Sequence, residues 1–455
     1  MSIWRTKPIS AKPENNLRRS LSMWDLTLLG VGAVIGAGIF VITGVAAATK
    51  AGPAISLSFV VAGMACFFSA LVYAELASMF PLSGSAYTYA YVSLGEIIAW
   101  VMGWMLLLEY GISTAVVAIG WAGYVNRILS DAGFLLPQAL RAGPWEGGSV
   151  NLMAGLVVLG ASVVLSRGVR ETSRVNNIVV MVKLFVILAF LALAAPHVEP
   201  RHWMPFMPFG WTGVLAGAGS IFFAYIGFDA VCTAAEEAKR PEKDVPWGLV
   251  LSLFICTTLY IAVALMLTGM IPYQELNVAD PVAFALSHVG ERLGSALVAA
   301  GAIAGLSSVI VVMLYGQSRI FFAMARDGLL PPFFCEVHPK YLAPTRPALA
   351  AGVGIALVAA FFPLEIVHKL VNIGTLATFI VVCVAVMVLR VRHPELPRVF
   401  RAPWMPMTPL LAIVFCLGLI AGLGWETLAT FFAWMAVGLV IYWSYARKRS
   451  KLASS

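Results

Sequence analysis

The sequence is poor in charged residues. They make up 11% of the 455 residues, whereas 60% are hydrophobic and the mean hydropathy is +0.89. Soluble domains carry about 25% charged residues, and a soluble chain of this size cannot bury so much apolar surface. The alternating strands and aromatic girdles of a membrane β-barrel are also missing. The composition therefore predicts an all-α integral membrane protein.

The sequence also lacks the motifs of catalytic and metal sites. The six cysteines are scattered without a CxxC pair, which argues against redox and metal chemistry. Neither HExxH nor GxSxG occurs. All six histidines fall in or beside loops, so we expect no histidine proton relay within the membrane. We therefore expect no enzyme activity, no metal and no cofactor.

The net charge of +8 does not indicate a nucleic-acid partner, because the basic residues lie in short tracts between apolar segments. The longest polar loops have about 25 residues, too few for a signalling domain of the usual size. A receptor without transport activity is therefore disfavoured.

Long apolar segments dominate the rest of the chain. A membrane helix needs about 20 apolar residues, and on that measure we predict twelve spans. They cover residues 25–48, 54–80, 97–125, 150–166, 177–196, 210–236, 246–271, 295–324, 346–362, 366–391, 405–422 and 427–446.

The distribution of Lys and Arg predicts the orientation. With the N-terminus inside, cytoplasmic segments hold 23 of the 30 Lys and Arg residues, outer segments hold six, and Lys183 lies within a span. The positive-inside rule then places both termini in the cytoplasm. Residues 1–24 form a polar arm without the apolar region of a signal peptide, so we expect the first span to be retained. We expect a multi-pass protein of the cell (inner) membrane with a cytoplasmic tail at 447–455.

Two spans contain runs of small residues close to a charge. The first has "DLTLLGVGAVIGAGIF", and the sixth has "GVLAGAGSIFFAYIGFDAV". Breaks five spans apart are expected if spans one to five (25–196) and six to ten (210–391) form an inverted repeat, followed by two extra helices (405–446). Unwound backbone at membrane depth is tolerated where it lines a binding cavity. A half-helix N-terminus there would face a carboxylate, and free carbonyls would accept from an ammonium group.

The glycines alone have a second interpretation. Gly32 and Gly36 form a GxxxG pair, a spacing typical of close packing between membrane helices. A dinucleotide fingerprint does not fit, because the spacing is GxGxxxGxG and no strand precedes it. The paired break in the sixth span is what favours a binding site.

Three ionisable residues lie inside predicted spans. Lys183 either extends its ammonium group to the inner interface or faces the bundle and exchanges a proton. Glu109, near the middle of the third span, marks either a structural hydrogen bond or a functional site. Asp229 follows the sixth-span break and would either cap the second half-helix or handle a proton. Glu75, near the end of the second span, is interpreted as structural.

Four segments together resemble bacterial amino acid permeases of the amino acid–polyamine–organocation superfamily, in the cationic amino acid transporter branch. They are "LGVGAVIGAGIFVITG", "YAELASMFPLSGSAYTYAY", "FFAYIGFDAVCTAAEEAKRPEKDVPWGL" and "YGQSRIFFAMARDGLLP". The likeness covers nearly the whole chain. It implies a LeuT-like fold of two inverted five-helix repeats with broken helices 1 and 6, plus two C-terminal helices.

The resemblance also implies roles for individual residues. The substrate α-carboxylate would meet the N–H groups of Ala37 and Gly38, and Phe223 would gate the site. The α-ammonium would meet backbone carbonyls, those of Val34, Phe223, Ala224 and Ile226. Lys183 matches the helix-five lysine associated with proton coupling, and Glu109 and Asp229 match acidic positions of proton-coupled members.

The substrate is inferred from what faces the predicted pocket. Many relatives have Ser or Thr where this chain has Ala37, so carboxylate recognition there would rest on the backbone. No acidic side chain is placed to hold a cationic head group, and Met313 would fill the pocket floor or pack between helices. We expect a proton-coupled symporter that imports small neutral L-amino acids such as alanine by alternating access. The alternative is a transporter or exchanger of arginine and lysine. The expected partners are the amino acid, the proton as coupling ion and membrane lipid; whether a small accessory subunit binds is left open.

Overall fold

The computed structural model describes residues 4–6, 21–80, 85–167, 173–235, 238–336 and 345–451. The regular elements of this part of the chain are all helices, and its single β-type contact is an isolated bridge between Leu21 and Ala238. Eight of its helices are long and apolar enough to cross a membrane, and four shorter apolar helices accompany them. The prediction of an all-α membrane protein is thereby confirmed at the level of helix content. Twelve crossings and an inverted repeat stay predictions.

The principal helices are, in chain order, Met23–Val34 (α1), Ile55–Met79 (α3), Ser85–Ser93 (α4), Glu96–Asp131 (α5), Gln138–Arg141 (α6), Leu152–Ser166 (α7), Ser173–Ala194 (α8), Gly210–Ile221 (α9), Ala230–Thr233 (α10), Pro241–Met270 (α11), Pro281–His288 (α12), Arg292–Arg326 (α13), Thr345–Phe361 (α14), Leu364–Arg392 (α15), Met407–Ala421 (α16), Trp425–Ile441 (α17) and Arg447–Arg449 (α18). Between α1 and α3 the chain forms the π-helical segment Gly38–Ile42 (η1), the short helix Thr43–Ala46 (α2) and a second π-helical segment, Ala47–Ala51 (η2). The 3-10 helix Phe222–Tyr225 (η7) follows α9.

The expected spans match these elements closely, except at the two breaks and in the loops. The first expected span divides into α1, η1, α2 and η2, and the sixth divides into α9, η7 and α10. The short helices α4 and α12 were not expected, because the prediction searched for apolar segments of about 20 residues and both helices are much shorter.

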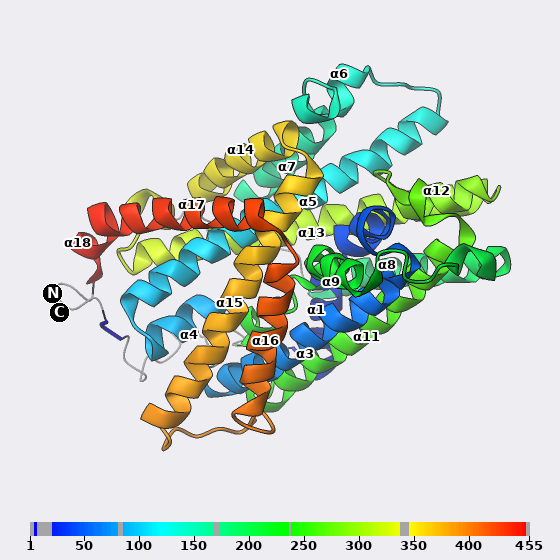
Figure 1. The fold of residues 1–455 in the computed structure, drawn as a ribbon. Coiled ribbons are helices and arrows are strands. Elements are labelled where there is room, and N and C mark those ends of the chain that lie inside the picture. Colours follow the sequence, from blue (N-terminus) through cyan, green and yellow to red (C-terminus); the bar gives the residue numbers. More distant parts are fainter. Residues whose placement is uncertain are drawn as a thin grey trace.

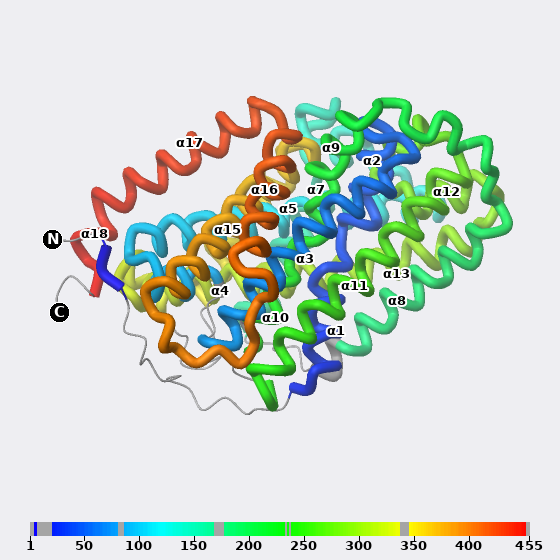
Figure 2. Tube along the Cα trace, turned by 60° about the horizontal axis from the view of Figure 1, so that its bottom comes forward, coloured from blue at the N-terminus to red at the C-terminus, as the bar shows by residue number. Residues whose placement is uncertain are grey.

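Figures 1 and 2 show how the long helices surround the broken ones. Helices α5 and α13 pack along each other, as do α11 and α3, and α1 lies against α11 and α8. The outer surface is apolar: Phe185, Phe254 and Val414 each expose more than 60% of their surface. Apolar side chains on that scale fit a lipid-facing exterior.

The first and last segments that the structure describes meet at one face. The described residues Trp4–Thr6 lie beside α18 (Figure 2), and the N–H of Glu96 donates to the carbonyl of Arg5. The buried Glu96 carboxylate accepts hydrogen bonds from Tyr442 and Ser450. One carboxylate at the start of α5 thus joins both terminal segments.

Candidate functional site

The first break lies at the end of α1. Helix α1 begins with a capping box between Ser22 and Asp25 and ends at Val34. Residues 35 and 36 form a bend, and η1 begins at Gly38 with Ala37 as its N-cap residue. Among the described residues, no backbone carbonyl accepts the N–H groups of Ala37 and Gly38. The start of η1 therefore has two backbone donors without a backbone acceptor in the part of the chain that the structure describes.

The second break follows η7. Ile226 has an extended backbone, and Gly227 has a φ of +106°, which disfavours any residue with a Cβ. A Cβ at Gly227 would also lie 3.1 Å from the Ala33 carbonyl oxygen and 3.2 Å from the Met313 Cε. Glycine is needed here for both the backbone conformation and the approach of the first break.

The two breaks touch each other at a second glycine. A Cβ at Gly38 would lie only 2.2 Å from the Cα of Ala224, so any side chain there would push η1 and η7 apart. A Cβ at Gly30 would lie 2.6 Å from the Ser252 Oγ on α11, whereas Gly36 has room at 3.6 Å. Close packing thus involves Gly30 and Gly38, whereas Gly36 of the GxxxG pair has ordinary van der Waals room.

Side chains from other helices donate hydrogen bonds to backbone carbonyls at the first break. Lys183 on α8 donates from Nζ to the Gly32 carbonyl at 2.8 Å. The Tyr260 hydroxyl on α11 lies 2.9 Å from the Val34 carbonyl and 2.9 Å from the Ala224 carbonyl. A hydroxyl has one proton, so it donates to one of these two carbonyls at a time. The other carbonyl is then available to a second donor.

The surfaces around the breaks enclose a small cavity of about 10 Å³. It is lined by Ala33, Val34, Gly36, Ala37, Gly38, Ser113, Val117, Phe223, Ile226, Val309 and Met313. The lining has no charged side chain. Its polar groups are the unwound backbone and the Ser113 hydroxyl, which has no hydrogen-bond partner in the described structure.

Six of the seven residues expected to bind substrate line this cavity, namely Val34, Ala37, Gly38, Phe223, Ile226 and Met313. The seventh, Ala224, lies directly behind it against Gly38. The structure therefore brings the whole expected set together, while their contact with a substrate stays a prediction.

Lys183 faces the bundle and does not reach the interface. Its side chain is fully buried, and a Cβ at Gly305 of α13 would lie 3.0 to 3.5 Å from its Cγ, Cδ and Cε atoms. Gly305 thereby leaves room for the aliphatic part of the lysine. The alternative of an ammonium at the inner interface is wrong, and Lys183 joins α8, α13 and the first break.

Glu109 and Asp229 are buried near the second break. Glu109 on α5 is 2% exposed, and its Oε2 has no hydrogen-bond partner in the described structure. Asp229 is 3% exposed and occupies the N-cap position of α10, but its side chain makes no capping hydrogen bond. The role of Asp229, in capping or in proton handling, stays a prediction.

Sequence reasoning missed three residues of this region, Ser113, Tyr260 and Gly305. Ser113 follows Glu109 by four residues, so helical periodicity places both on one face of α5. Tyr260 is the only tyrosine of α11, and a buried tyrosine needs a hydrogen-bond partner for its hydroxyl. Gly305 has no signal of its own, because only the position of Lys183 explains it.

His368 also differs from expectation. It lies one turn inside α15, is 2% exposed, and its Nε2 is 3.0 Å from the Ser220 Oγ of α9. Its Nδ1 is 2.9 Å from the Leu364 carbonyl, so Nδ1 carries a proton and Nε2 accepts from the serine. His368 links α15 to the first half of the sixth segment.

Comparison with known proteins decides the family. The model of a family described as amino acid permease matches residues 21–445. The chain belongs to the amino acid permease family. It is 47% identical to the branched-chain amino acid permease BcaP of Bacillus subtilis (strain 168), over 99% of both chains. The methylthioribose transporter of the same organism is also 47% identical, again over 99% of both chains. The human cationic amino acid transporter 4 is 38% identical over 86% of this chain and 63% of its own.

Family membership makes the chain a transporter and not an enzyme. The candidate site consists of two interrupted helices in contact, with backbone donors on one segment and carbonyls on both. Such an arrangement suits an amino acid, which carries a carboxylate and an ammonium group on one carbon atom.

Proposed function

We propose that this permease imports small neutral L-amino acids such as alanine, together with protons. The observation that carries the proposal is the pair of helix breaks in contact. The N–H groups of Ala37 and Gly38 have no backbone acceptor among the described residues, and the carbonyls of Val34 and Ala224 lie beside them. The α-carboxylate binds at the start of η1, where the helix dipole adds positive potential. The α-ammonium donates to whichever carbonyl Tyr260 leaves free.

The lining of the cavity supports a neutral substrate. Val117, Phe223, Ile226, Val309 and Met313 surround the space beyond the backbone, and no carboxylate lies among the lining residues. A lysine or arginine head group would be desolvated there without a counter-charge, at a cost of several kcal/mol. Small apolar side chains avoid that cost.

Lys183 supports coupling to protons without sodium. Its ammonium group occupies the position between α8, α13 and the first break, and donates to a carbonyl that would otherwise be open to a cation. A lysine exchanges its proton more readily once it is out of water. We propose that loss of this proton weakens the link from α8 to α1 and permits movement of the first break between its inward and outward states.

Two further substrate classes come from the relatives' names. The branched-chain permease relative favours a larger apolar amino acid, which fits the apolar lining if Met313 and Phe223 move aside. The relatives named for cationic amino acids favour arginine or lysine. Equal identity to a methylthioribose transporter shows that 47% does not fix the substrate, since that compound lacks both groups of an amino acid.

The topology of the proposal follows the charge distribution. We propose that both termini lie in the cytoplasm, that twelve segments cross the cell membrane, and that the two five-helix halves form an inverted repeat. The meeting of the first and sixth segments at their breaks supports the repeat.

The test is an amino acid panel in proteoliposomes containing the full-length protein. Labelled alanine uptake is measured in sodium-free buffer, with and without an inward proton gradient, against unlabelled alanine, leucine, valine, arginine and lysine. The proposal predicts gradient-driven alanine accumulation and competition by neutral amino acids. Strong arginine competition with negligible alanine transport would instead establish the cationic class, and a requirement for sodium would exclude proton symport.

A further inference from the structure

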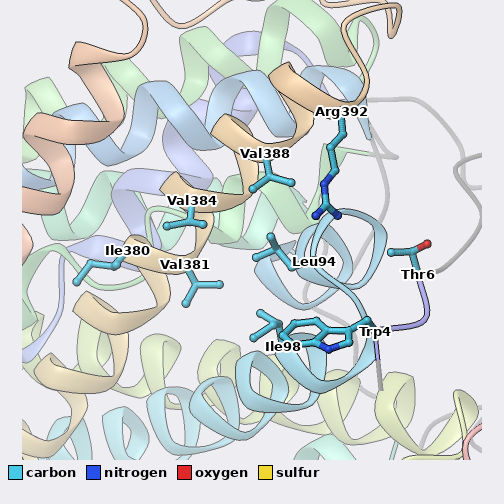
Figure 3. Close-up of a pocket in the computed structure, with 9 residues that line it drawn as sticks. All are labelled: Trp4, Thr6, Leu94, Ile98, Ile380, Val381, Val384, Val388 and Arg392. Carbon is cyan, nitrogen blue, oxygen red and sulfur yellow. The ribbon is translucent and has the colours of Figure 1, made fainter. Parts of the chain in front are cut away.

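A groove lies away from the transport site, between α15 and the start of α5. It has a volume of about 340 Å³, within the range of small-molecule sites, which is about 300 to 1,000 Å³. Its lining is Trp4, Thr6, Leu94, Ile98, Ile380, Val381, Val384, Val388 and Arg392 (Figure 3). It is apolar along its length and carries a single charge at one end.

The length of the groove corresponds to one leaflet of a membrane. The residues from Ile380 to Arg392 span about 18 Å of helix at 1.5 Å per residue. Half of a hydrocarbon core of about 30 Å is about 15 Å. The apolar part therefore runs from near the middle of the membrane to one surface, which is the path of a lipid acyl chain.

The charge at the surface end has no partner within the described ranges and can bind an anion. Figure 3 shows the Arg392 side chain directed toward Thr6 and Leu94 at the mouth of the groove. Its neighbour Arg390 binds both oxygens of Glu75, and Arg398 lies 3.4 Å from the same carboxylate. Arg392 is exposed and has no hydrogen bond or ion pair with any other residue that the structure describes.

We propose that this groove binds an anionic phospholipid, with an acyl chain along Val384 and Val388 and the phosphate on Arg392. Charge complementarity selects the occupant: a guanidinium above an apolar slot matches a phosphate ester above a hydrocarbon chain. Trp4 closes the side of the groove beside Ile98. Because Trp4 and Arg5 join the groove to Glu96 and the C-terminal residues, the bound lipid would stabilise the meeting point of both terminal segments.

The test is native mass spectrometry of the full-length protein in detergent. Phosphatidylglycerol and phosphatidylcholine with identical chains are titrated separately, and glycerol 3-phosphate serves as the head group alone. We expect phosphatidylglycerol to bind about fivefold more tightly than phosphatidylcholine, the effect of one cationic side chain near a membrane surface. Glycerol 3-phosphate should not compete.

Matched variants locate the site. Arg392→Gln should abolish the preference for phosphatidylglycerol, and Arg392→Lys should keep it. Arg401→Gln is the control, because Arg401 is exposed in the following loop and does not line the groove. Val388→Phe should weaken both lipids by filling the slot. An undiminished preference in Arg392→Gln, unchanged binding in Val388→Phe or competition by glycerol 3-phosphate would each overturn the proposal.

Discussion

Two buried carboxylates of this permease have opposite surroundings. Glu75, near the end of α3, is fully buried and accepts from the Nε and a terminal N–H of Arg390 and from the backbone N–H of Ala402. Glu109, in the middle of α5, is equally buried, but no cation is paired with it and its Oε2 has no partner in the described structure. A charge whose binding capacity is filled holds helices together. A charge left with open capacity suits a proton or a ligand.

The same contrast separates larger regions. We call the residues Glu75, Arg390, Arg398 and Ala402 the ion-pair cluster, and Lys183, Glu109, Ser113 and Tyr260 the break-side polar groups. In the ion-pair cluster one carboxylate meets two arginines. At the break-side polar groups one hydroxyl faces two carbonyls, and Ser113 has no partner. We therefore expect the ion-pair cluster to stabilise the fold and the break-side polar groups to act in transport.

The largest expected effect is on the ion-pair cluster. Glu75→Gln removes the charge that two arginines share, one of them with a side chain only 5% exposed. Removing one partner of a buried ion pair costs about 3 to 5 kcal/mol. We expect a large loss of thermal stability, measured as Tm in detergent. Glu109→Gln is the matched control, and it should change Tm little; equal losses would erase the distinction between the two carboxylates.

Tyr260→Phe should combine both kinds of effect. It leaves the Val34 and Ala224 carbonyls without their hydroxyl donor, which costs about 1 to 3 kcal/mol when the groups are buried. It should also raise KM for uptake, because the two breaks lose the side chain that joins them. Ser58→Ala removes a comparable buried donor to the Val214 carbonyl and should lower Tm without changing KM. A normal KM in Tyr260→Phe would place Tyr260 with the structural residues.

Asp280 is intermediate between the two carboxylates. It lies before α12, and among the described residues it forms one ion pair, with Arg127 at 3.3 Å. Burial raises the pKa of Asp280 to about 6, although Arg127 opposes the shift and Asp131 adds to it. The folded protein therefore takes up a proton at a higher pH than the unfolded chain, whose value is near 3.8.

The sign of the pH effect follows from that shift. The stabilising contribution is complete below pH 3.8 and is lost as the pH rises through about 6, at about 1.4 kcal/mol for each pKa unit. The Tm of the wild type should therefore gain on that of Asp280→Asn as the pH falls from 7.5 to 5. A constant difference between the two Tm values would show that Arg127 holds Asp280 ionised over this pH range.

Ser113→Ala should have the smallest effect on stability. The hydroxyl has no hydrogen-bond partner in the described structure, so the free energy of unfolding should change by less than about 0.5 kcal/mol and Tm should hardly move. The KM for alanine uptake should nevertheless change. Thr114→Ala is the control on the adjacent residue, whose hydroxyl donates to the Tyr110 carbonyl of its own helix. Identical kinetics in both variants would remove Ser113 from the site.

Much of the fold could be predicted because length and hydropathy determine membrane helices directly. Helix α15 begins and ends within two residues of the expected span 366–391, since hydrocarbon thickness sets both ends. The positions of the two helix breaks could be predicted from the runs of small residues in the first and sixth spans. Gly227 shows the physical reason, because its φ of +106° is a backbone conformation that favours glycine. Helices α4 and α12 were missed, because the short sequences of loop helices carry no membrane-length signal.

The site could be predicted only in part, for a physical reason. Resemblance placed Val34, Ala37 and Gly38 beside Phe223 and Ile226, and the structure brings them together. The partners that satisfy the released carbonyls depend on contacts across the chain: Lys183 lies 151 residues from Gly32, and Tyr260 lies 226 residues from Val34. A local sequence pattern cannot show which residues so far apart in the chain come into contact. The sequence therefore allowed the Lys183 side chain to extend to the inner interface or to face the bundle, and its packing against Gly305 excludes the first.

The most direct test of the central claim is alanine uptake by Lys183→Ala in proteoliposomes. The wild type should accumulate alanine under an inward proton gradient without sodium. The variant, shown to be folded by its Tm, should lose accumulation because the first break no longer has the ammonium group that donates to Gly32. Full gradient-driven accumulation by Lys183→Ala would contradict the account.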